Sequence, residues 1–314
     1  MTAQRNTKAR PLAARSSWLL LVVALAFAQA TIGYATTYTN AINDGGWRAV
    51  SSVFECRLEQ RVPFFGEAVF RTRAGEASGF YLRARSARFQ AGDAQLIARS
   101  PVWAAASEQT NFGTVPVKKG TRPLWLGADK AELMLAQLAS GKELELVKES
   151  WYLPEPAQPL RLAITSIGFR SEYRKYLKCL GGLLPANFDQ MKRTPLYFQA
   201  GPVEELSPSL TRKLDKLLQL VKHDAKIRQF YIDGHTDALG DRADNLVLSK
   251  ARAELVSQYL MRRGIPEDWI VVRWHGERYP VASNGSRSGR AKNRRVTVRM
   301  ERVEKIEVLP LAAK

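Results

Sequence analysis

The chain has 314 residues, of which 45% are hydrophobic and 25% are charged. This composition excludes a fibrous or largely disordered protein, and the length suffices for two domains with separate cores. The formal net charge is +18, and +14 remains without residues 1–30, which carry four basic side chains and no acidic one. Such a charge favours anionic partners.

Residues 1–30 are predicted to form a secretory signal peptide. Four basic residues precede an apolar run over 18–28, which ends in the cleavage motif Ala28-Gln29-Ala30. The run is shorter than the about 20 residues of a spanning helix. Cleavage after Ala35 and an uncleaved anchor are alternatives, and no cysteine stands nearby for lipid attachment. We therefore expect a periplasmic protein that associates with the outer membrane or cell wall, does not span a membrane and binds no nucleic acid.

The two cysteines, Cys56 and Cys179, are predicted to form a disulfide. An even number of cysteines behind a signal peptide favours pairing, because the exported compartment oxidises thiols. The bond would close a long loop and add about 4–5 kcal/mol of stability in the chain-entropy description. Two buried thiols are the alternative.

Residues 31–185 are predicted to form a mainly antiparallel β domain. Phe80 to Arg85 alternates apolar and polar residues like a half-buried strand. Shorter strand-like pieces lie at 69–71, 96–98 and 162–164, and one helix is expected over 130–139. The expected turns are at Gly75, Gly79, Gly92, Pro101, Gly113, Pro116 and Gly120. The Gly-rich stretch at 179–185 is interpreted as the join to a second domain.

Residues 186–314 alternate strand and helix patterns. Strands are predicted at 196–198, 227–232, 270–274 and 296–300. A first helix opens with Ser207 as N-cap and Pro208 at its first position. A second helix runs from about Asn245 to Arg263, and Gly264 ends it. Its buried stripe is expected to be Leu248, Ala251, Leu255, Val256 and Tyr259. This order predicts an α/β sandwich with helices on one face of a mixed sheet, so the whole chain is α+β.

A carboxylate and a guanidinium are spaced to form a clamp. Asp237 follows the second strand of this region, and Asn245, Leu248, Ser249 and Arg252 share one face of the next helix. Asp237 would take an ammonium group and Arg252 a carboxylate, as suits a zwitterion. A salt bridge between Asp237 and Arg252 is the alternative. Side chains that could complete the cleft crowd a loop near the end: Asn284, Arg287, Arg290, Asn293, Arg294 and Arg295.

An ordered series of motifs over 192–302 resembles the OmpA-like peptidoglycan-binding domain. The series is Gly234-His235-Thr236-Asp237, Gly240, Asn245-x-x-Leu248-Ser249-x-x-Arg252-Ala253, Tyr259-Leu260, Gly264-Ile265, Gly276-Glu277, Pro280, Asn284 and Gly289-Arg290-x-x-Asn293-Arg294-Arg295-Val296. The resemblance implies that Asp237 and Arg252 bind the diaminopimelate residue of the peptidoglycan stem peptide. It also implies that Thr236, Asn245, Leu248, Ser249 and Arg295 line the same cleft, without catalysis or a cofactor.

The N-terminal half resembles the MotY-type proteins of sodium-driven flagellar motors. The matching segments are Trp47, Phe54-Glu55-Cys56-Arg57-Leu58-x-Gln60, Phe65-Gly66-Glu67-Ala68-Val69-Phe70, Ala74-Gly75-Glu76 and Leu183-Leu184-Pro185-Ala186-Asn187-Phe188-Asp189. The resemblance implies a periplasmic T ring that anchors stator units around the flagellar basal body. The N-terminal half would then contact the basal body and a partner T-ring protein.

The sequence leaves two alternative functions. The first is an OmpA-like envelope protein that tethers the wall without a motor role. The second is a wall-cleaving zinc enzyme, but the three histidines, His223, His235 and His275, do not form a zinc-protease motif. We therefore expect no enzyme and no metal. The aromatic residues of the N-terminal half are interpreted as core, and a protein-docking surface is the alternative: Trp47, Phe54, Phe64, Phe65, Phe70, Phe80, Tyr81, Trp103 and Trp125.

Overall fold

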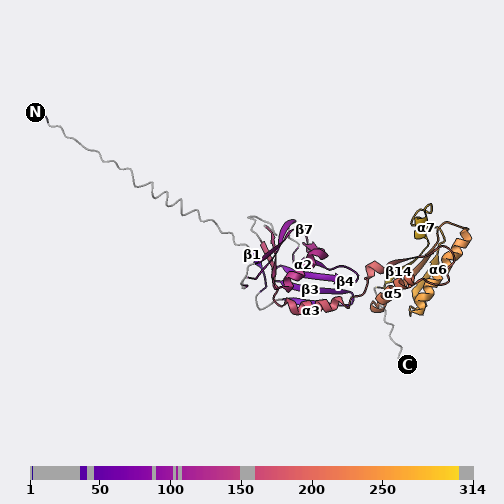
Figure 1. The fold of residues 1–314 in the computed structure, drawn as a ribbon, viewed down its shortest axis with the longest axis horizontal. Helices are drawn as coiled ribbons and strands as arrows, with labels where there is room; N and C mark the ends of the chain where they lie inside the picture. The colour runs from indigo at the N-terminus through magenta and orange to yellow at the C-terminus, as the bar shows by residue number, and fades with distance from the viewer. Residues whose placement is uncertain are drawn as a thin grey trace, which may run out of the picture.

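The computed structural model describes residues 36–40, 46–86, 90–101, 108–148 and 160–303, with the single residues 2 and 104. The signal peptide predicted at 1–30 and its cleavage sites at Ala30 and Ala35 lie outside the described residues. Figure 1 shows two bodies joined by a narrow waist, with indigo to magenta segments in one and orange to yellow segments in the other.

In the described part of the chain, the N-terminal body is built from two sheets of five strands each. One sheet is antiparallel throughout and has the order β2 (Trp47–Ser51), β3 (Glu55–Val62), β4 (Gly66–Arg73), β5 (Gly79–Ala84) and β8 (Trp125–Leu126). The other has the order β1 (Thr36–Tyr38), β10 (Leu160–Ile164), β9 (Glu143–Lys148), β6 (Gly92–Arg99) and β7 (Gln109–Val117), and only β1 pairs in parallel. The prediction of a mainly antiparallel β domain is confirmed.

Two of the predicted turns are wrong, because Gly113 and Pro116 lie inside β7. β7 is an edge strand, where a proline lacking its N–H breaks no ladder on the open side. Gly113 has a φ of +79° near a register shift between β6 and β7. A glycine at a β-bulge therefore mimicked a turn in the sequence.

Two helices pack against these strands: α2 (Ala128–Ala139), which was predicted, and α3 (Phe169–Leu180), which was not. The interpretation of residues 36–180 as having one helix was therefore wrong. Only Phe169 and Tyr176 of α3 are buried, so the apolar stripe is too sparse to stand out in the sequence. The Phe169 ring packs edge-on against Trp47 at 5.0 Å, and the Tyr176 hydroxyl lies 2.6 Å from Thr72 Oγ1.

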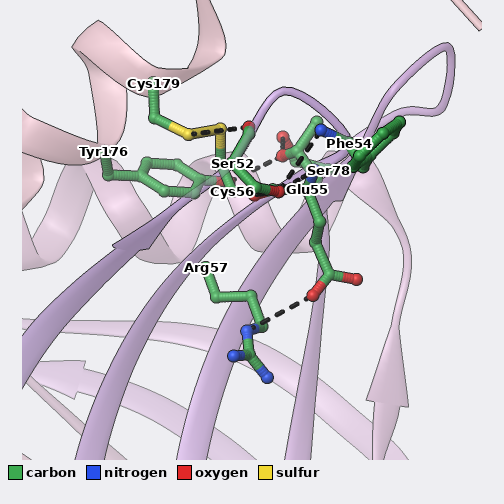
Figure 2. The surroundings of a disulfide bond; sticks show 9 residues. Ser52, Phe54, Glu55, Cys56, Arg57, Ser78, Tyr176 and Cys179 are labelled. Carbon is green, nitrogen blue, oxygen red and sulfur yellow. Dashed lines mark hydrogen bonds and ion pairs between the residues drawn. A yellow bond between two sulfur atoms is a disulfide. The ribbon is translucent and has the colours of Figure 1, made fainter. Parts of the chain in front are cut away.

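The predicted disulfide is present and joins α3 to the adjacent sheet. Cys56 in β3 and Cys179 in the last turn of α3 have Cα atoms 5.9 Å apart and are separated by 123 residues. Figure 2 shows the bond beside Tyr176, above the strands of the sheet. The covalent link and the Tyr176 contact with Thr72 thus fasten the same helix to neighbouring strands.

The C-terminal body has a mixed sheet with the order β11 (Arg193–Tyr197), β14 (Arg295–Arg302), β12 (Ile227–His235) and β13 (Ile270–Trp274). β12 and β13 are parallel, and the other pairs are antiparallel. The helices are α5 (Pro208–His223), α6 (Arg242–Arg262), the short η1 (Glu267–Trp269) and α7 (Arg287–Asn293). α5 and α6 contribute Leu214, Leu217, Val256 and Leu260 to one core with sheet residues such as Phe230 and Val298. The predicted α/β sandwich is confirmed.

α6 begins earlier than predicted and presents a different face to the core. Asp241 is its N-cap and accepts a 2.7 Å hydrogen bond from Ala243 N. Ala251 is exposed, whereas Ala253, Val256 and Leu260 are fully buried. The expected apolar stripe is confirmed at Val256 and Tyr259, which are buried, and is wrong at Ala251. Three polar residues, Asn245, Ser249 and Arg252, occupy much of the remaining buried face.

The short helix α4 (Phe188–Met191) lies at the waist between the two bodies. Asn187 and Gln190 form a capping box, in which the side-chain oxygen of each residue accepts a hydrogen bond from the backbone N–H of the other. Asn187 Nδ2 also donates to Ala74 O at 3.0 Å, and Gln190 Nε2 donates to Gly75 O at 2.9 Å. Ala74, from the N-terminal body, is fully buried in the C-terminal core. A domain boundary at residue 185 stays a prediction.

Among the described residues, no helix has both the length and the apolar character needed to cross a membrane.

Candidate functional site

A cavity of about 540 Å³ opens where β12 ends and α6 begins. Its walls come from the 236–241 loop, the exposed side of α6, the segment after β11 and the end of α7. The lining includes Gly201, Thr236, Asp237, Asn245, Leu248, Arg252 and Arg294. Besides Asp237, four predicted cleft residues therefore line the cavity: Thr236, Asn245, Leu248 and Arg252.

Gly234 allows α6 to pass directly over the end of β12. A Cβ at this position would collide with Ser249 O. Because only glycine lacks this atom, the strand end and the helix approach each other closely enough to bring Asp237 and Arg252 to one cavity. The loop between them is fixed by Thr236 N, which donates to Gly276 O at 2.9 Å.

Asp237 is held by several contacts at the cavity wall. Its Oδ1 accepts from Leu239 N at 3.3 Å, and its Oδ2 pairs with Arg294 Nη1 at 2.8 Å. Asn284 Oδ1 fixes the next residue by accepting from Ala238 N at 3.2 Å. The alternative of a salt bridge between Asp237 and Arg252 is wrong in this structure, because the carboxylate pairs with Arg294 instead.

Arg252 is fully buried and only partly bonded. Its Nη2 donates to Gln199 O and to Gly201 O, both at 2.8 Å, and its guanidinium lies 5.4 Å from the centre of the Phe198 ring. Nε and Nη1 have no hydrogen-bond partner within the described part of the chain. Burial, reinforced by repulsion from Arg294, lowers the pKa of Arg252 to about 10, so the side chain remains charged at neutral pH.

Buried cations without a carboxylate cost free energy unless another group satisfies them. Arg252 therefore lines the cavity with two nitrogen atoms that lack a partner among the described residues, and Asp237 lines it with a carboxylate paired with Arg294. The Thr236 hydroxyl is also buried and has no partner among the described residues. The arrangement suits a ligand that carries a carboxylate and an ammonium group within one cavity.

Two predicted residues do not meet this cavity. Ser249 is fully buried, where its Oγ donates to Leu246 O at 2.8 Å and accepts from Gly276 N at 3.0 Å. Arg295 donates to Tyr279 O at 3.1 Å and faces the side of the sheet away from the helices. Both residues hold the loop around the site rather than line it.

The sequence placed Arg294 only among the side chains that could complete the cleft, and it named Arg295 as a site residue. In the structure, Arg294 lines the cavity and Arg295 does not. The chain passes from the last residue of α7 into β14 here, so adjacent side chains point to opposite sides. Asn293 is fully buried and clasps the preceding loop, with its Oδ1 accepting from Val281 N at 2.8 Å. The 199–202 segment, whose carbonyl groups hold Arg252, carried no distinctive side chain that the sequence could reveal.

His235 lies on the face of the sheet opposite α6. Its ring stacks on His275 at 4.9 Å, and burial lowers its pKa to about 4. Asp237 and His235 thus point to different sides. Within the described ranges, no group of three histidine, cysteine or acidic residues is placed to hold a metal.

Comparison with known proteins agrees with both halves of this architecture. A family model described as the MotY N-terminal domain matches residues 38–185, and the OmpA family model matches residues 197–294. The chain therefore combines a MotY N-terminal domain with an OmpA-family domain.

A relative along most of this length is the sodium-type flagellar protein MotY of Vibrio parahaemolyticus. It is 27% identical over 257 residues, which cover 81% of this chain and 86% of that protein. The peptidoglycan-binding protein ArfA of Mycobacterium bovis is 42% identical over 89 residues, or 28% of this chain and 26% of ArfA.

Among solved structures, the peptidoglycan-associated lipoprotein of Burkholderia pseudomallei is 25% identical and covers 34% of this chain and 89% of its own, with a TM-score of 0.31. All the residues that line the cavity described above lie within the OmpA-family domain, and none belongs to the MotY N-terminal domain.

Proposed function

We propose that the OmpA-family domain binds peptidoglycan without chemistry and takes the diaminopimelate residue of a stem peptide into the Asp237–Arg252 cavity. The observation that carries the proposal is the fully buried Arg252, which lines the same cavity as Asp237 and whose Nε and Nη1 have no hydrogen-bond partner among the described residues. A ligand carboxylate would satisfy Arg252, and a ligand ammonium would bind Asp237 beside Arg294. The name of the ArfA relative supports a wall ligand.

We further propose that the chain is a periplasmic T-ring protein of a flagellar motor, exported by its signal peptide and associated with the outer membrane and cell wall. The support is the match to the sodium-type flagellar relative over most of both chains. In this role, the OmpA-family domain grips the wall, while the MotY N-terminal domain contacts the basal body and a partner T-ring protein. Stator units are thereby held around the basal body.

Sedimentation with purified sacculi tests the wall-binding half. Asp237→Asn and Arg252→Lys each remove one recognition group while preserving size or charge, and each should weaken binding about 10- to 100-fold. Arg262→Lys on the exposed side of α6 and Asp268→Asn in η1 are matched controls that should bind like the parent. Nuclear magnetic resonance with a soluble diaminopimelate-containing peptide should place its contacts at the cavity. Equal binding by parent and both site variants would disprove the clamp.

A gene deletion tests the motor half separately. The deletion strain should lose fluorescent stator foci at flagellar bases, and the parent gene should restore them. A fluorescent fusion should gather at flagellated sites. Uniform labelling of the envelope with intact stator foci would instead support an OmpA-like wall tether without a motor role.

A further inference from the structure

The outward face of the β2-β3-β4-β5-β8 sheet carries an arginine and aromatic cluster that the proposed wall-binding site does not use. Strand register places Val69 of β4 opposite Tyr81 of β5, and Tyr81 opposite Trp125 of β8. Side chains directly opposite in antiparallel strands point to the same face. Thr72 is three residues after Val69 in β4, so its side chain points to the opposite face, where it contacts Tyr176 of α3. The row of Val69, Tyr81 and Trp125 therefore faces away from that helix.

Trp125 lies flat and exposed on this face, contrary to its interpretation as core. It is 54% exposed and stacks on Tyr81 with ring centres 5.8 Å apart. Its indole also lies against Gly79, where an added Cβ would come within 2.9 Å of the ring. The glycine therefore leaves room for a tryptophan that covers the sheet rather than entering the core.

Three arginines surround the two rings. The guanidinium of Arg71 lies 5.5 Å from the Tyr81 ring centre and 5.3 Å from that of Trp125. Arg83 and Arg122 lie 5.9 and 5.4 Å from the Tyr81 ring centre. Tryptophan, tyrosine and arginine are the residue types most enriched at binding hot spots. We call Arg71, Tyr81, Arg83, Arg122 and Trp125 the Trp125 cluster.

Positive charge is in excess around the Trp125 cluster. Arg83 pairs with Glu67 at 2.8 Å, and Arg71 is 3.8 Å from Glu55. Arg122 is exposed and has no ion pair within the described residues. Beside the cluster, a hollow of about 140 Å³ is lined by Arg61, Arg83 and Arg85 around the single acid Glu67. Arginines so placed suit incoming carboxylates, which they can bind bidentately.

We propose that the Trp125 cluster is a docking surface for an acidic segment of a protein partner. Carboxylates of the segment would meet Arg122 and the arginine-lined hollow, while an apolar side chain would pack on the exposed Trp125 ring. This inference rests on the proposed motor role, because it assigns the contact with the basal body to one face of the MotY N-terminal domain.

Co-sedimentation of the full-length exported chain with basal bodies from a deletion strain tests the assignment. Trp125→Ala and Arg122→Glu should each weaken binding at least about tenfold. Leu133→Ala removes an apolar side chain of α2 with 53% exposure, and Lys119→Glu reverses an exposed charge in the same β7–β8 connection as Arg122. Both controls should bind like the parent. Binding of the parent should also weaken as ionic strength rises.

Sacculus binding by the same variants separates this inference from the proposed function. Trp125→Ala and Arg122→Glu should sediment with sacculi like the parent. If they lose sacculus binding while remaining folded, the face grips the wall and the inference is overturned. If the parent itself does not sediment with basal bodies, the motor role and this inference both fail. If the parent and both cluster variants sediment equally with basal bodies, only this inference fails.

A photo-crosslinking amino acid at position 119, which is exposed in the same β7–β8 connection but lies outside the Trp125 cluster, identifies the chemistry of the occupant. Crosslinked peptides rich in aspartate and glutamate support the proposal, whereas neutral or basic peptides contradict it. Vesicles containing phosphatidylglycerol provide the membrane alternative. If they bind the parent but not Arg122→Glu, the cluster is a membrane surface and the inference is overturned.

Discussion

Arginines of the two domains differ in burial and in the groups that surround them. Arg252 of the OmpA-family domain is fully buried, has no carboxylate partner in the described structure and keeps two donors unused. Arg71 and Arg83 of the MotY N-terminal domain are partly exposed, and glutamates and aromatic rings surround them. A buried guanidinium with unused donors points to a small ligand that completes it, whereas exposed and stacked guanidinium groups point to a broad contact surface.

The domains also differ in what stabilises them. The MotY N-terminal domain holds α3 with a covalent bond, since both cysteines of the chain lie in Cys56–Cys179. The OmpA-family domain instead relies on close helix–sheet packing and on buried polar groups such as Asn245, Ser249 and Asn293. The stability of the OmpA-family domain should therefore depend on how closely its helices pack on the sheet and on the protonation of its buried groups. It should not depend on whether the disulfide is reduced.

Removal of the disulfide should give the largest difference between the domains. Cys56→Ser combined with Cys179→Ser should lower the free energy of unfolding of the N-terminal domain by about 4–5 kcal/mol, because the unfolded chain regains its freedom. The OmpA-family domain should melt as in the parent. Calorimetry with two resolved transitions measures both, and reduction of the parent serves as control. An equal loss in both transitions would refute independent stabilisation.

Acid should destabilise the OmpA-family domain through His235. Its pKa is lowered to about 4 in the fold, mainly by burial. The unfolded histidine binds a proton below about pH 6.5, so the contribution is complete above pH 6.5 and is lost as the pH falls toward 4. The loss should approach about 3 kcal/mol.

Denaturation curves between these pH values measure this effect. His235→Asn should flatten the pH dependence, whereas His223→Asn, at the exposed end of α5, should not. The pKa of Asp233 is lowered, despite the opposing effect of burial, by Arg273 and His275, so that carboxylate loses its contribution only at still lower pH. An unchanged slope in His235→Asn would show that the histidine does not carry the effect.

Close packing at the end of β12 should make Gly234→Ala destabilising by about 2 kcal/mol, since the new Cβ meets Ser249 O and α6 must move. Gly285→Ala is the matched control, because its Cβ would come no closer than 3.4 Å to Ser283 Oγ. Chemical denaturation reports stability, and sacculus binding reports whether α6 still carries Arg252 to the cavity. Full stability in Gly234→Ala would argue against the close approach.

The smallest effect is expected at the exposed arginines. Arg83→Met removes a 2.8 Å ion pair with Glu67, but the Arg83 side chain is 41% exposed, so water already screens the charges. The free energy of unfolding should fall by less than about 1 kcal/mol. A larger loss, measured by denaturation, would mean that the Trp125 cluster stabilises the fold instead of mainly serving as a surface.

Asp237 and Arg252 could be found from the sequence because a strand end, a glycine and a helical spacing bring them together by rules of local geometry. The choice between Arg294 and Arg295 could not, because one residue of shift at the start of β14 reverses the direction of a side chain. α3 was missed because a disulfide, the Phe169 ring and the hydroxyl of Tyr176 join it to the sheet, without a continuous apolar stripe.

Trp125 shows a second limit of sequence reasoning. A tryptophan in a β-rich segment is usually core, and only the pairing of β8 with β5 places it on the outward face. Gly113 and Pro116 were predicted as turns but lie in β7 for a related reason, because an edge strand accepts residues that a central strand rejects. The position of a strand in the sheet depends on residues far away in the sequence. That position decides whether a tryptophan is buried or exposed and whether a glycine or proline ends a strand.

The hydrogen bonds around α4, at the waist, determine how a pull on one domain reaches the other. The chain between them contains Gly181-Gly182, which alone would extend under tension. Leu184 N donates to Val53 O at 2.9 Å, Asn187 Nδ2 to Ala74 O at 3.0 Å and Gln190 Nε2 to Gly75 O at 2.9 Å. The three bonds cross the same junction, so a pull on it reaches both the β2–β3 hairpin, through Val53, and the β4–β5 hairpin, through Ala74 and Gly75. The junction would then resist a pulling force as a stiff connection rather than as a slack linker.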